Sequence, residues 1–123
     1  CVFLSLSLTH TIYPCCFSLF FLLPLYDLCT NEIEQNGVAG TLPHELSRLQ
    51  HLRNLVLEEG ILTGTIPTEL GKIQTLEQID FNFNLLQGSI PEELYSLGNL
   101  RQLDLNDNEL TGAISTRVGE LSQ

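Results

Sequence analysis

A chain of 123 residues allows a single domain at most, and a composition of 43% hydrophobic and 16% charged residues indicates an ordered protein. The charge is one-sided, because five Lys and Arg stand against fifteen Asp and Glu and give a net charge of −10. Phosphate binding requires clustered Lys and Arg, so this balance excludes nucleic acid as a partner. An acidic surface either keeps a protein soluble or attracts cationic partners, and both interpretations stay open.

The first 27 residues form an apolar segment without Glu, Lys or Arg, in which Asp27 is the first charged residue. Their densest apolar run, residues 15–23, has the length of a signal-peptide core and is too short to span a bilayer. The segment starts on Cys1 and lacks an initiator Met, a basic n-region and a cleavage motif, so we expect the chain to be a fragment. Three interpretations stay open: a signal or anchor remnant, sequence mis-joined to the reading frame, or a cap on the following domain.

From residue 28 onward the chain repeats itself with a period of 24 and no insertion, which divides it into units 28–51, 52–75, 76–99 and 100–123. Each unit opens with LxxLxL, whose alternation is typical of a strand that turns its second and third apolar residues inward. The inward positions are Ile33, Leu55, Leu57, Ile79, Phe81, Leu103 and Leu105, with Asn31 in place of an aliphatic residue in the first unit. One unit cannot bury its own leucines, so the units must stack.

The rest of each unit contains residues typical of a turn, followed by a segment that runs back along the other side of the coil. An Asn follows the strand, and its amide is expected to bond buried backbone groups, so that stacked units form a structural ladder of Asn36, Asn84 and Asn108. Gly60 replaces this Asn in the second unit and should loosen that turn. A bend glycine comes four residues after the ladder position. An extended Ile-Pro pair and a tail with the periodicity of a short 3₁₀ turn then complete the unit.

The full pattern LxxLxLxxNxLxGxIPxxLxxL resembles the plant-type leucine-rich repeat of plant receptor ectodomains and of algal and diatom proteins, over residues 28–123. The resemblance implies an α/β solenoid: a right-handed horseshoe of about four 24-residue repeats with a short parallel sheet on its concave face. Ser115 departs from the pattern by replacing Pro, and the family's Trp-containing cap is absent. The next repeat would begin one residue after Gln123, so the array is expected to continue.

In such a solenoid the outward positions of the strands tile the concave face, where we expect a ligand. This face is acidic and rich in amides, with one exposed aromatic residue that would anchor a partner among hydrogen-bonding groups. The predicted ligand-binding residues are Glu58, Asp80, Asn82, Phe83, Asp104, Asn106 and Asp107. The alternative interpretation is that these are ordinary solvated residues on a polar sheet.

Catalytic and metal chemistry is not expected. Asp80 and Asp104 would stack at a separation close to that of a retaining glycosidase, but strand spacing alone produces this distance. The run 104–109 begins like a calcium-binding loop, yet Glu109 occupies the position that requires glycine. The three histidines have no metal-ligand spacing, so neither a metal nor a cofactor is predicted.

The sequence therefore predicts a recognition module that binds a protein, peptide or glycan on its concave face, within a receptor-like signalling protein if the resemblance extends that far. A structural matrix protein and a secreted inhibitor of hydrolases are the alternatives. The resemblance implies an extracellular or cell-surface location, with membrane attachment at or outside the N-terminal segment.

Overall fold

The computed structural model describes residues 32–120. The apolar segment 1–27, its cysteines and the start of the first repeat at residues 28–31 lie outside these described residues. The described elements are, in chain order, β1 (Glu32–Glu34), β2 (Ala39–Thr41), η2 (His44–Arg48), β3 (Asn54–Val56), β4 (Ile61–Thr65), η3 (Thr68–Lys72), β5 (Gln78–Asp80), β6 (Leu85–Gly88), η4 (Glu92–Ser96), β7 (Gln102–Asp104), β8 (Glu109–Leu110) and η5 (Thr116–Glu120).

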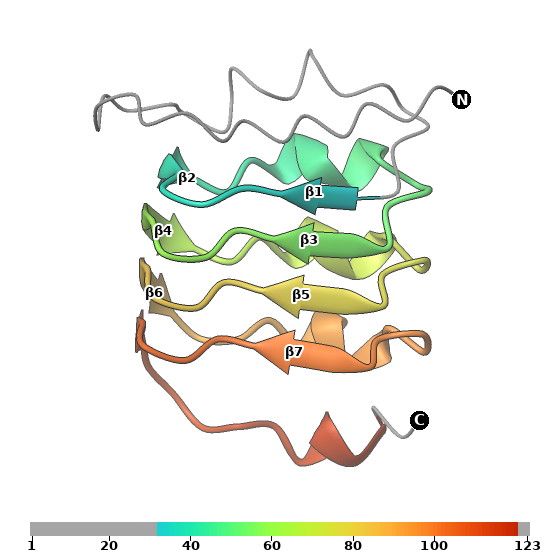
Figure 1. Cartoon of the computed structure of the whole chain (residues 1–123). Helices are drawn as coiled ribbons and strands as arrows, with labels where there is room; N and C mark the ends of the chain where they lie inside the picture. Colours follow the sequence, from blue (N-terminus) through green and yellow to red (C-terminus); the bar gives the residue numbers. More distant parts are fainter. Residues whose placement is uncertain (1–31, 121–123) are drawn as a thin grey trace.

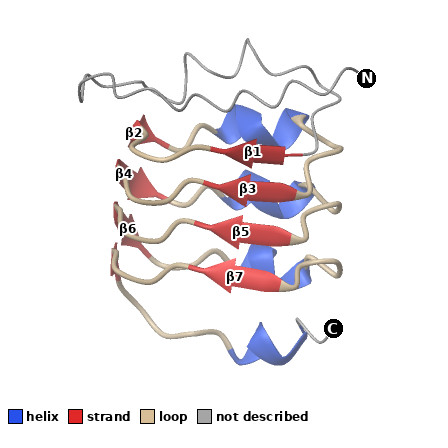
Figure 2. Cartoon of the chain, in the orientation of Figure 1, coloured by secondary structure: helices blue, strands red, loops and turns tan. Residues whose placement is uncertain are grey.

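The elements form coils stacked one on the next (Figure 1). Each coil passes through a strand of a first parallel sheet, ordered β1-β3-β5-β7, and then a strand of a second parallel sheet, ordered β2-β4-β6-β8. A short 3₁₀ helix closes the coil behind the first sheet, so that strands and helices occupy different sides (Figure 2). This is the repeating α/β solenoid that the 24-residue period predicts.

The strands of the first sheet are three residues long because only the middle of each LxxLxL segment pairs with its neighbours. Leu55 pairs with Ile79, and Ile79 pairs with Leu103, so residues 24 apart lie side by side. Leu57 and Phe81 follow on the same inward side and are fully buried. Alternation along each strand therefore places one face in the interior and leaves the other to the surface.

The 3₁₀ helices start immediately after a proline and contribute one inward leucine each. Pro67 is extended, with φ −71° and ψ 135°, and its carbonyl accepts a hydrogen bond of 3.2 Å from the Leu70 N–H. Pro43 and Pro91 stand at the same place before η2 and η4. Leu46, Leu70 and Leu94 are completely buried, which joins the helices to the interior shared by the two sheets.

Burial falls toward the last coil. Leu103, Leu105 and Leu110 are only partly buried, although they hold the same positions as buried residues in earlier coils. Among the described residues no further coil covers them on that side, and stacking is what buries each coil. In a repeat protein, a residue at an inward position is therefore fully buried only where neighbouring coils cover it.

The second sheet is a feature that the sequence interpretation missed, since it expected only an extended return after the turn. Gly64 lies in β4 and Gly88 ends β6, and both of these bend glycines adopt a positive φ of +76°. The glycines also allow close stacking, because a Cβ at Gly88 would lie 3.0 Å from the Thr65 Cγ2 of the preceding coil. A side chain there would therefore separate the coils as well as strain the backbone.

The first described coil corrects the expected register. Ile33 pairs with Leu55, whereas an uninterrupted 24-residue period aligns Ile33 with Leu57. This shift of two residues places an aliphatic side chain, rather than Asn31, beside Leu55 in the interior. The shortened coil turns at Gly37, whose φ is +70° and whose N–H lies 3.2 Å from the Glu59 carbonyl oxygen.

The described helices are short, and within residues 32–120 none has the length and apolar character needed to cross a membrane.

Candidate functional site

The predicted ligand-binding residues lie on the outer face of the first sheet and in the turns that follow its strands. Asp80 and Asp104 are partners in adjacent strands. Asp80 is not the solvated residue expected at this position, because it is only 8% exposed. Its Oδ1 accepts a hydrogen bond of 3.2 Å from the Asn82 N–H, so the carboxylate caps the end of β5.

Three of the polar candidates, in and after the strands β5 and β7, are joined by hydrogen bonds. The Asn106 N–H lies 3.1 Å from the Asn82 Oδ1 and 3.4 Å from the Asp104 Oδ1. Asp104 and Asn82 are half-buried, whereas Asn106 is exposed. Side chains held by such bonds are preorganised, so a ligand would meet them with less loss of side-chain entropy.

Phe83 lies in the turn after β5 rather than on the strand itself, and 56% of it is exposed. Its φ is 53°, in the left-handed region that is unfavourable for a bulky aromatic residue. Glu59 and Asp107 hold the corresponding turns with φ 52° and 51°. The turn therefore imposes this conformation in successive coils, and neither burial nor backbone preference explains a phenylalanine here.

Asn84 and Asn108 fix these turns from the inside. The Asn84 Oδ1 accepts a hydrogen bond of 3.0 Å from the Leu62 N–H, and its Nδ2 donates to the Leu57 and Phe81 carbonyls at 2.8 and 3.1 Å. Asn108 repeats the pattern one coil later, with its Oδ1 3.0 Å from the Leu86 nitrogen. Each amide thus bridges two coils.

Asn36 does not make these bonds, which corrects its expected place in the ladder. It is exposed, because the shortened first coil moves it out of register. Gly60 has a related explanation: a Cβ there would lie 2.6 Å from the Val38 carbonyl oxygen and 2.7 Å from the Asn84 Oδ1. The second turn is therefore closed tightly around its glycine, instead of being loosened by it.

Charge is segregated around the coil. The segments that carry the two sheets, residues 32–41, 54–65, 78–88 and 102–110, contain no Lys, Arg or His; we call their outer face the two-sheet surface. Its charged residues are all acidic: Glu32, Glu34, Glu58, Glu59, Asp80, Asp104, Asp107 and Glu109. Arg48, Lys72 and Arg117 lie in the 3₁₀ helices, whereas Arg53 and Arg101 directly precede β3 and β7, and Arg53 forms an ion pair of 3.3 Å with Glu77. The two-sheet surface therefore carries a negative potential, and the nearest basic residues, Arg53 and Arg101, lie where the strands of the first sheet begin.

Two exposed apolar residues beside Phe83 were not predicted. Ile61 in β4 is 55% exposed and Leu85 in β6 is 42% exposed. Both face outward from the second sheet, as the alternation of burial along its strands shows. The sequence analysis did not select them, because they are not among the inward hydrophobic positions of the repeat. The second sheet, to which they belong, was not expected either.

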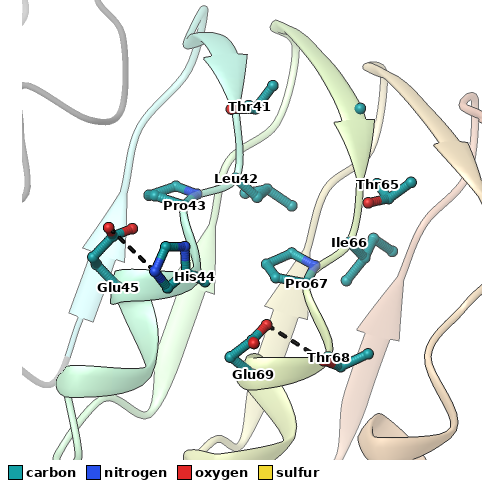
Figure 3. A pocket seen from close by; sticks show the side chains of 11 residues that line it. Thr41, Leu42, Pro43, His44, Glu45, Thr65, Ile66, Pro67, Thr68 and Glu69 are labelled. Atoms are coloured by element: carbon teal, nitrogen blue, oxygen red, sulfur yellow. Dashed lines mark hydrogen bonds and ion pairs between the residues drawn. The ribbon is translucent and has the colours of Figure 1, made fainter.

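A shallow groove opens on another side of the molecule, between the Leu-Pro and Ile-Pro segments of the first two coils (Figure 3). Its lining includes Thr41, His44 and Glu69 but none of the predicted ligand-binding residues. A backbone hydrogen bond holds the pKa of Glu69 below its usual value, helped by Lys72 and Thr68. Adjacent Pro-containing segments would form such a groove between any two stacked coils. The groove therefore follows from the stacking and does not by itself indicate a binding site.

Metal ligation finds no support in residues 32–120, where no three His, Cys, Asp or Glu side chains gather as a metal would require.

Comparisons with known proteins agree with this architecture. The family model described as Leucine Rich Repeat matches residues 75–97 and 99–121. Similar solved structures include the plant peptide hormone receptor RGFR1 in complex with RGF2, at 36% identity over 71% of this chain and 14% of that one, with a TM-score of 0.68. No curated protein matches the chain at the level of sequence.

Two further structures have the same fold. The ectodomain of the Arabidopsis thaliana receptor kinase GASSHO1/SCHENGEN3, in complex with CASPARIAN STRIP INTEGRITY FACTOR 2, is 32% identical over 74% of this chain and 11% of its own, with a TM-score of 0.72. A plant ice-binding protein is 34% identical over 75% of this chain and 31% of its own, with a TM-score of 0.71. The chain thus spans less than a third of each of these three proteins. The stacked coils, the bend glycines and these matches together place the chain among the leucine-rich-repeat proteins, with repeats of the plant type.

Proposed function

We propose that the chain is a recognition module that binds a protein or peptide ligand on the outer face of its first sheet, as part of a receptor-like protein at the cell surface. The observation that carries the proposal is the two-sheet surface, whose charged residues are all acidic. Such a potential attracts cationic partners and speeds their association. It favours a basic peptide or protein segment over a neutral glycan.

The candidate residues suit this role. Asp104 and Asn82 are held by hydrogen bonds to the Asn106 N–H, and Phe83 supplies an exposed aromatic group at the end of the same face. An apolar anchor beside preorganised polar groups is the usual composition of a binding hot spot. The similar receptor RGFR1 is a plant peptide hormone receptor, solved in complex with RGF2, which supports a peptide as ligand. The half-buried Asp104 would orient the ligand rather than react with it.

The experiment is selection of peptides from a random display library on the full chain, followed by affinity measurements on charge-neutral variants. We expect the selected peptides to be basic. The variant Glu34→Gln, Glu58→Gln, Asp104→Asn should weaken their binding by about tenfold or more, as expected for lost charge pairs in an interface.

The matched control makes the same change in net charge on the helical side, through Glu45→Gln, Glu69→Gln and Glu93→Gln in η2, η3 and η4. Its effect should stay within about twofold at 0.15 M salt, where distant exposed charges are screened. Equal losses in the two variants, or selected peptides without a basic bias, would refute the proposed binding face.

A further inference from the structure

We infer that the second sheet carries a docking surface of its own, on which a basic protein segment inserts an apolar side chain. This surface is the flank patch, formed by Ile61, Phe83 and Leu85. It goes beyond the proposed function, because Ile61 and Leu85 belong to the second sheet and not to the face proposed above.

The three residues of the flank patch are neighbours. Leu85 pairs with Thr63 in the adjacent strand, so it lies diagonally beside Ile61, within reach of an aliphatic side chain. The Phe83 carbonyl accepts a hydrogen bond of 3.1 Å from the Gly60 N–H, which fixes Phe83 next to the start of β4. The patch thus joins two adjacent coils at the corner between the sheets.

Exposure of this patch is unusual for the molecule. Ile61, Phe83 and Leu85 are three of the four large apolar residues that are exposed in the described part of the chain, and Ile114 is the fourth. Ile61 and Leu85 hold the same repeat position in successive coils, and the equivalents of Phe83 and Leu85 one coil later are Asp107 and Glu109, which are polar. The turn and strand therefore do not require apolar side chains at these positions, and clustered exposed apolar residues are typical of interaction sites.

Charge complementarity identifies the occupant. The patch is bordered by Glu59, Asp107 and Glu109, and Glu109 is held toward the patch's strand by a hydrogen bond of 2.7 Å from the Gln87 Nε2. A second copy of the chain would bring these acidic borders together, and like charges oppose such an interface. A segment with Lys or Arg on both sides of Leu or Phe would satisfy the apolar centre and the acidic border at once.

The test uses three amidated heptapeptides titrated into the full chain by calorimetry: alternating Arg and Leu, alternating Arg and Ser with the same charge, and alternating Glu and Leu. We expect the Arg–Leu peptide to bind about tenfold more tightly than the Arg–Ser peptide, the ratio for burying roughly one leucine. The Glu–Leu peptide should not bind. Equal affinity for the Arg–Leu and Arg–Ser peptides, or no binding of the Arg–Leu peptide, would overturn the inference.

Variants then locate the site. Leu85→Ser and Ile61→Ser, singly and together, should remove the preference for Arg–Leu over Arg–Ser while leaving the circular dichroism spectrum unchanged. Ile114→Ser is the matched control, because Ile114 is 71% exposed and lies outside the flank patch; it should preserve the preference. A preference that survives in the double variant, or that Ile114→Ser also removes, contradicts the inference.

The two proposals fail separately. The variant Glu34→Gln, Glu58→Gln, Asp104→Asn tests the first sheet through the selected library peptides, whereas the ratio of Arg–Leu to Arg–Ser affinity tests the flank patch. Loss of the first with retention of the second would leave the flank patch as the binding surface.

Discussion

At the scale of single residues, the turn amides show how the coils are joined. Asn84 is buried and uses its amide to bridge the Leu57 carbonyl and the Leu62 N–H. Because Asn84 is buried, no water molecule would take the place of its amide in bonding these backbone groups. Asn36 has the same spacing in the sequence but lies exposed. Identical residue types in the same repeat position therefore contribute differently to stability.

Replacement of these two residues measures that difference. We expect Asn84→Ala to lower the free energy of unfolding by about 2–4 kcal/mol, because it leaves buried donors and acceptors unpaired. Asn36→Ala should change it by less than about 0.5 kcal/mol, as is usual for an exposed residue. Urea unfolding of both variants compares the two directly, and similar losses would contradict the register described for the first coil.

Phe83 provides a second test at this scale, because its positive φ disfavours a phenylalanine whereas its proposed binding role requires one. Asn tolerates positive φ better than Phe, so Phe83→Asn should raise the free energy of unfolding by about 0.5–1 kcal/mol. The same variant should weaken binding of the Arg–Leu peptide. Thermal unfolding and calorimetry together check the opposite signs, and Glu59→Asn serves as the control at the equivalent turn, with φ 52°. A destabilised Phe83→Asn variant would show that Phe83 is retained for packing instead.

At the scale of elements, the sequence predicted the elements that follow from residue spacing within one repeat. It did not predict the elements that form only when repeats stack. The strands of the first sheet, the inward positions from Leu55 to Phe81 and the 3₁₀ helices after proline follow from local periodicity. The second sheet does not, because its strands pair only once the coils are stacked, and their short sequences alternate weakly. For the same reason Ile61 and Leu85 were not selected from the sequence, whereas Asp104, Asn106 and Phe83 were predicted as ligand-binding residues from their places in or after LxxLxL.

Burial of equivalent positions also differs between coils. The repeat predicts that Leu57→Asp and Leu105→Asp both abolish folding, but Leu57 is fully buried and Leu105 only partly so. We now expect Leu57→Asp to abolish cooperative folding, because it buries an unpaired charge. Leu105→Asp should instead leave a folded chain with a lower Tm. Circular dichroism during heating separates the outcomes, and a Leu57→Asp variant that still melts cooperatively would contradict the shared interior.

At the scale of the whole molecule, residues that stabilise the fold and residues proposed for recognition lie on different sides of each coil. The interior holds the aliphatic residues, the helical side holds Arg48, Lys72 and Arg117, and the two-sheet surface holds carboxylates, amides and the flank patch. Association of a basic ligand with this surface is favoured by charge and opposed by salt, since the Debye length shortens from about 10 Å at 0.1 M to about 3 Å at 1 M. Recognition is thus assigned to one side of the coil.

Hydrogen–deuterium exchange of the full chain, with and without a selected basic peptide, tests this assignment. We expect slower exchange on binding in residues 54–65, 78–88 and 102–110, which carry the two sheets, and unchanged exchange in η2, η3 and η4. Protection confined to the 3₁₀ helices, or to the groove between Pro43 and Pro67, would contradict it.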